Sequence, residues 1–117
     1  MLGFQRLDVY ACAVRFLGLA AGLVGRTPRG TSELVDQLRR AALSIPLNIA
    51  EGTGKEGRDA ARYYRIARGS ALECAAVLDA MEALGVIVGI EVAEERELLE
   101  RIVSMLTKMR PELAGRR

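Results

Sequence analysis

Polar side chains recur at helical spacing in the stretch QLRRAALSIPLNIAEG, residues 37–52. Successive members lie three or four residues apart, which places them within an arc of roughly 80° on one α-helix. The members of this stripe are Gln37, Arg40, Ser44, Asn48 and Glu51. Such groups can form a hydrogen-bonded network or bind a ligand. Because no convergent nucleophile or base accompanies them, we interpret the stripe as structural and keep a ligand site as the alternative.

The expected partners of this stripe lie on the next helix. In an antiparallel hairpin that turns near residue 55, Arg40 comes level with about Ser70, so that Glu73 is within reach. We therefore expect a buried or half-buried network that fixes the helix register and the choice of partner. The expected members of this network and assembly surface are Gln37, Arg40, Ser44, Asn48, Glu51, Ser70 and Glu73.

Arginine side chains form a second stripe further along the chain. Arg58, Arg62 and Arg65 fall within roughly 60° of one another on one helix face, and Arg68 lies to one side. Aligned guanidinium groups can contact the backbone phosphates of RNA or DNA and release counterions. The alternative is a solvated face whose arginines pair with nearby carboxylates such as Asp59.

Other chemistry finds little support in the residues. The sequence has no histidine, which excludes imidazole metal sites and Ser-His or Cys-His nucleophile pairs. The Gly52–Thr53–Gly54 turn lacks P-loop spacing, and the acidic run of residues 91–100 is typical of a solvated helix face. Tyr63 is expected to face the core, which leaves base stacking unsupported. We therefore expect no catalytic, metal-binding or cofactor-binding residues and no enzyme activity.

The composition favours an all-α protein. Of 117 residues, 50% are hydrophobic but only 4% are aromatic, which favours close-packed helices over a sheet. Residues 1–72 carry 11 basic and 6 acidic groups (+5), whereas residues 73–117 carry 6 and 9 (−3). Cys12 and Cys74 are interpreted as two buried thiols, with a disulfide as the alternative.

Apolar periodicity predicts four helices, over about residues 5–24, 32–52, 57–84 and 91–109. Short connections make sequential neighbours antiparallel, so residues 1–117 are expected to form one up-down-up-down four-helix bundle. Pro46 lies inside the second helix, where it removes a backbone hydrogen bond at a cost of roughly 3 kcal/mol and predicts a kink. Pro111 is expected to stop the fourth helix.

The apolar faces predict self-association. On the second helix, apolar residues flank the polar stripe on both sides, with Ile45 on one side and Leu43 and Leu47 on the other. The first helix is apolar nearly all round, so a single protomer cannot cover both helices and we expect a homo-oligomer. The stripe of the first helix that we expect in the core contains Leu7, Tyr10, Val14, Leu17, Ala21 and Val24.

The apolar segment of residues 9–24 is not expected to enter a membrane. It is too short to span a bilayer and is interrupted by Arg15, and Asp8 is unlike the basic leader of a signal peptide. We therefore expect a cytoplasmic protein with no membrane partner.

Several of these stretches resemble a known family. The 37–52 segment, IARGSALE at residues 66–73, ALG at 83–85 and LDVY at 7–10 are similar to bacterial four-helix bundle proteins encoded in intervening sequences of large ribosomal RNA genes. The accessory variability determinant of diversity-generating retroelements is a relative of that family. The motif positions carried by this chain are Gln37, Arg39, Arg40, Ser44, Asn48, Glu51, Gly52, Gly69, Ser70 and Glu73. The resemblance implies fold and assembly roles for them, with no catalytic set.

The resemblance also implies how the chain assembles and what it binds. It implies a protomer that forms a ring-like homopentamer, which in the retroelement branch binds a reverse transcriptase and nucleic acid through a basic surface. The expected function is a non-enzymatic, pentameric scaffold that binds RNA or DNA through Arg58, Arg62, Arg65 and Arg68. The alternative is a protein-interaction module that docks a protein partner, for example a reverse transcriptase, without binding nucleic acid itself.

Overall fold

The computed structural model describes residues 1–28 and 30–115, with side chains as far as Met109. The elements are η1 (Gly3–Arg6), α1 (Asp8–Val24), α2 (Ser32–Thr53), α3 (Gly57–Ala83), η2 (Gly89–Val92) and α4 (Ala93–Gly115), where η1 and η2 are short 3-10 helices. The described residues contain no strand. The expected all-α class is therefore confirmed.

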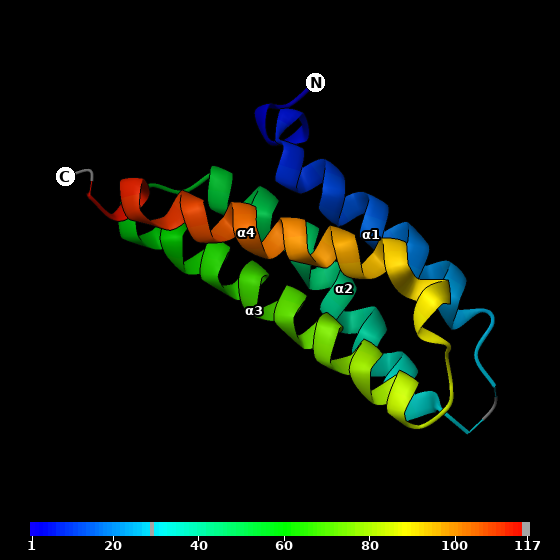
Figure 1. Ribbon diagram of the computed structural model, residues 1–117. Coiled ribbons are helices and arrows are strands. Elements are labelled where there is room, and N and C mark those ends of the chain that lie inside the picture. The colour runs from blue at the N-terminus through cyan, green and yellow to red at the C-terminus, as the bar shows by residue number, and fades with distance from the viewer. Residues whose placement is uncertain (29, 116–117) are drawn as a thin grey trace.

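Helices that follow one another in the chain run in opposite directions (Figure 1). α2 packs between α1 and α3, while α4 packs against α3 and closes the bundle on α1. The α1–α2 and α3–α4 connections lie at one end of the molecule, and the α2–α3 turn and the end of α4 lie at the other. The bundle is elongated, with extents of 49 × 27 × 22 Å. No helix in the described residues has both the length and the apolar content needed to cross a bilayer.

The helix ends differ from the expected ranges at several places. The first helix begins only at Asp8, because Leu7 is extended (φ −75°, ψ 133°) and separates α1 from η1. The fourth helix begins at Ala93, after η2, and continues through Pro111 to Gly115, so the expectation that Pro111 stops it is wrong. A proline this close to a helix end removes one backbone bond, to the carbonyl of Thr107, where carbonyls already lack helical partners.

The core is aliphatic and rich in small residues, but α1 turns a different face to it than expected. Val14 and Ala21 of the expected stripe are exposed. Both faces of α1 are apolar, and the face that carries Phe16 buries the larger area. The buried residues of α1 are Val9, Cys12, Ala13, Phe16, Ala20 and Leu23.

Pro46 is buried within α2, which runs without interruption from Ser32 to Thr53. Contacts with α3 hold this helix on both sides of the proline. Before it, the Ser44 and Ser70 hydroxyls are 2.8 Å apart; after it, the Tyr64 ring lies directly against Gly52. These contacts help to offset the backbone bond that proline cannot make.

Candidate nucleic-acid surface

Three polar side chains meet between α2 and α3, and we call them the polar seam: Ser44, Asn48 and Ser70. The Ser70 hydroxyl donates to Ser44 Oγ at 2.8 Å, and Asn48 Nδ2 donates to the same oxygen at 2.9 Å. Asn48 also donates to the Ser44 carbonyl at 2.9 Å. Ser70 is buried and the other two are half-buried. Because buried polar groups must find partners, the seam favours one register of α2 against α3.

The remaining members of the expected network lie on the surface. Arg40 and Glu73 are exposed, and Arg40 Nη2 donates to Gln37 Oε1 on its own helix at 2.9 Å. Glu51 is also exposed and lies 3.5 Å from Lys55 Nζ. The expectation that Arg40 and Glu73 are buried within the protomer is therefore wrong. A long charged side chain at the helix margin keeps its hydration by staying in water, which costs less than burial of an ion pair.

The outward face of α3 carries the arginines that the sequence singled out. Arg58, Arg62 and Arg65 are all exposed. The Arg62 guanidinium lies 3.7 Å from Asp59, with both side chains more than half exposed. An exposed pair of this kind contributes little to stability, so these guanidinium groups can exchange their present contacts for phosphate oxygens.

Arg68 is separate from this exposed stripe. Its side chain is half-buried and Nε donates to Thr107 Oγ1 on α4 at 2.7 Å. Thr107 in turn donates to the Val103 carbonyl at 2.7 Å. Arg68 therefore joins α3 to α4, and it is less available for a ligand than its three neighbours.

Tyr63 and Tyr64 take the opposite positions from those expected. Tyr64 is buried, and this burial raises the pKa of its hydroxyl. Tyr63 is half-buried, with the Arg62 guanidinium 4.7 Å and Lys55 Nζ 5.9 Å from its ring centroid. The expectation that Tyr63 faces the core is wrong because the space that Gly52 leaves open admits the next residue instead. Sequence reasoning missed this cation–aromatic cluster, although Lys55 and Arg62 beside a tyrosine signal it.

The thiols do not add a reactive group to this surface. Cys12 and Cys74 are both free and buried, as expected. Burial, followed by the nearby charge of Glu73, raises the pKa of Cys74 to about 12, so the thiol is protonated at neutral pH. Among the described residues, no group of three or more acidic, cysteine or histidine side chains could hold a metal ion.

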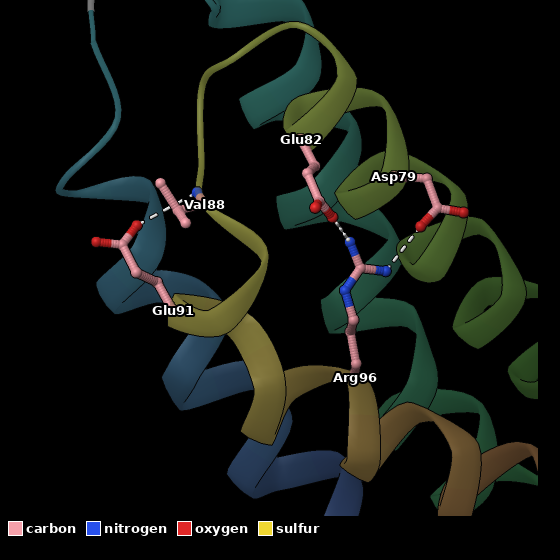
Figure 2. A network of polar contacts seen from close by, with 5 residues as sticks. All are labelled: Asp79, Glu82, Val88, Glu91 and Arg96. Carbon is pink, nitrogen blue, oxygen red and sulfur yellow. Dashed lines mark hydrogen bonds and ion pairs between the residues drawn. The ribbon is translucent and has the colours of Figure 1, made fainter.

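A second polar cluster, missed at the level of sequence, ties α3 to α4 at the other end of the molecule (Figure 2). Arg96 donates from Nη1 to Asp79 Oδ1 at 2.7 Å and from Nη2 to Glu82 Oε1 at 2.8 Å. Arg15 on α1 also pairs with Glu94 on α4. The isolated arginine within the acidic 91–100 run was the available signal.

The comparisons with known proteins agree with the fold. The family model described as "23S rRNA-intervening sequence protein" matches residues 5–108. That range includes the polar seam, the exposed arginines of α3 and most of α4. No curated protein matches the chain.

Proposed function

Because the chain belongs to the 23S rRNA-intervening sequence protein family, we propose that it is a non-enzymatic, homo-oligomeric scaffold that binds nucleic acid through the exposed arginines of α3. The proposal places the protein in the cytoplasm, with RNA or DNA as its ligand. The family name, which refers to ribosomal RNA, supports the choice of nucleic acid.

The exposed arginine stripe is the observation that carries this proposal. Arg58, Arg62 and Arg65 project from one face of α3, and the seven residues from the first to the last extend over roughly 10 Å of helix. Lys55 and the half-buried Tyr63 lie beside them at the α2–α3 turn. Such a surface can contact several phosphates of one strand, and electrostatic attraction would supply most of the affinity.

Self-association would multiply this surface. Leu43 and Leu47 on α2 are 46% and 58% exposed, and Ile66 on α3 is 40% exposed. Exposed apolar side chains on neighbouring helices favour contact with another copy. We further propose that Pro46 kinks α2, that the assembly is the ring-like pentamer implied by the family resemblance, and that five copies raise the net charge from +2 to about +10.

A gel-shift series at increasing salt tests the nucleic-acid part of the proposal. A labelled RNA hairpin and a DNA duplex of the same sequence serve as probes. The joint variant Arg58→Gln, Arg62→Gln, Arg65→Gln should bind more weakly, and its plot of log affinity against log salt should be shallower by roughly 0.9 per lost duplex contact and protomer engaged.

A matched control separates a binding surface from a general charge effect. Arg26→Gln, Arg39→Gln, Arg101→Gln removes the same charge from exposed positions outside the stripe and should bind almost as the wild type does. Equal losses in the two variants would contradict a site on α3. Failure of the wild type to bind either probe at low salt would overturn the nucleic-acid proposal altogether.

The second candidate function is docking of a protein partner without direct contact to nucleic acid. The acidic run of residues 91–100 favours it, because that surface would repel phosphates. A protein that co-purifies with the chain after nuclease treatment, together with no binding to the two nucleic-acid probes, would select this candidate.

A further inference from the structure

The connection between α3 and α4 exposes three large apolar side chains in a short space. We call residues 84–92 the apolar loop. Leu84 is 69% exposed, Val88 60% and Ile90 84%. Single exposed apolar residues are common on protein surfaces, but three within seven residues form a patch that usually marks an interaction site.

The exposure of these side chains is built into an ordered backbone. α3 ends in a Schellman motif, in which Val86 N donates to the Met81 carbonyl at 2.8 Å and Gly85 N to the Glu82 carbonyl at 3.0 Å. Gly85 has the positive φ of 75° that this motif requires. The turn therefore leaves α3 in one defined direction.

The rest of the loop is fixed at both ends. Ile87 and Val92 are buried in the core, and between them Glu91 Oε1 accepts a hydrogen bond from Val88 N at 3.3 Å (Figure 2). Arg96 on α4 holds Asp79 and Glu82 of α3, as described above. Because the loop is ordered before binding, a partner that covers it would lose little affinity to loop ordering.

A recess lies beside the loop, between it and the start of α2. Its volume is about 430 Å³. Apolar atoms of Leu34, Leu84 and Val86 line part of it, and Glu33 supplies a carboxylate. The recess is large enough for an apolar side chain, so the end of the bundle presents both a pocket and projecting apolar groups.

The charge around the loop selects the kind of partner. Residues 79–100 carry seven acidic groups and one basic group, a net charge of −6. Such a surface repels nucleic acid and anionic lipid, and it attracts lysine and arginine. The acidic side chains of the segment are Asp79, Glu82, Glu91, Glu94, Glu95, Glu97 and Glu100.

We propose that the apolar loop and its recess form a docking site for a partner-protein segment in which apolar anchor residues are flanked by lysine or arginine. The apolar anchors fill the recess and cover Val88 and Ile90, while the flanking cations face the surrounding carboxylates. This site is separate from the arginine stripe. It does not depend on nucleic-acid binding, so failure of either proposal leaves the other standing.

Fluorescence anisotropy with three synthetic peptides of equal length tests the site on the full chain. One peptide is an amphipathic lysine–leucine helix, one replaces lysine with glutamate, and one replaces leucine with serine. The lysine–leucine peptide should bind most tightly at physiological salt. The variant Val88→Ser, Ile90→Ser should bind it at least about tenfold more weakly, and Glu33→Gln should weaken it and reduce its salt dependence.

The control variant Leu2→Ser, Leu72→Ser removes two exposed apolar side chains elsewhere and should bind the peptide as the wild type does. Circular dichroism of each variant verifies that it is folded. The proposal is overturned if the lysine–leucine peptide does not bind, if the lysine–serine peptide binds equally well, or if Val88→Ser, Ile90→Ser has no effect. A lower assembly mass of that variant in light scattering would assign the surface to a second copy instead and would also overturn the proposal.

Discussion

Gly52 is required by the ring that lies against it. A Cβ placed on this residue would be 2.7 Å from Cε1 of Tyr64, closer than a real Cβ contact allows. Glycine inside a helix costs about 1 kcal/mol relative to alanine. Here the cost is offset because the Tyr64 ring packs directly on the α2 backbone and is removed from water.

Gly52→Ala should lower the free energy of unfolding by about 1–3 kcal/mol, because the overpacking of Tyr64 exceeds the gain in helix propensity. Gly18→Ala in α1 is the matched control. A Cβ at Gly18 meets nothing within 4 Å, so this change should stabilise the protein by up to about 1 kcal/mol. Denaturant titration of both variants gives the comparison, and an unchanged midpoint for Gly52→Ala would show that the ring moves aside freely.

The polar seam controls how α2 and α3 lie against each other, whereas the longer charged groups nearby do not. Ser44 Oγ accepts hydrogen bonds from both Asn48 and Ser70. By contrast, Arg40 stays on the surface of α2 with Gln37. Register is therefore set by short side chains whose desolvation costs little once they are paired.

Ser70→Ala should lower the free energy of unfolding by about 1 kcal/mol, because it removes a buried hydrogen bond between two helices. Arg40→Ala should change it by less than about 0.5 kcal/mol, since this guanidinium is exposed. Thermal unfolding of the two variants under one set of conditions measures the difference. A large loss for Arg40→Ala would show that this arginine has a buried partner, such as one in an assembled ring.

The four helices and the buried face of α4 follow from periodicity, because α4 has a single apolar stripe, which includes Leu99, Ile102 and Leu106. The buried face of α1 does not follow, since apolar residues surround that helix. The exchange of Tyr63 and Tyr64 depends on the opening at Gly52, which exists only once α2 and α3 are packed. Patterns within one helix are therefore predictable, whereas choices between helices need the tertiary structure.

At the scale of the whole molecule, the apolar side chains left on the outside of the α2–α3 hairpin matter most. Leu43 and Leu47 lie on the same side of α2, and Ile66 is exposed on α3. The polar seam runs between the two helices that carry them. A second copy that covered this side would bury both the apolar groups and the half-buried Asn48.

Leu43→Ser, Leu47→Ser should reduce the mass of the assembly, because it removes apolar area that another copy would cover while leaving the protomer core intact. Multi-angle light scattering over a dilution series measures this mass. Leu72→Ser, on α3, is the control and should leave the mass unchanged. A wild-type protein that remains a folded monomer at every concentration would contradict the assembly.

The two ends of the bundle carry opposite charge. α3 separates them: its first residues lie beside Lys55, Arg58 and Arg62, and its last residues lead into the acidic 79–100 segment. Each protomer is therefore an electric dipole about 40 Å long. In a cyclic assembly the components along the symmetry axis add and the perpendicular ones cancel. To the extent that the protomers stand along that axis, one face of the ring would attract polyanions while the other held a cationic protein, and neither ligand would displace the other.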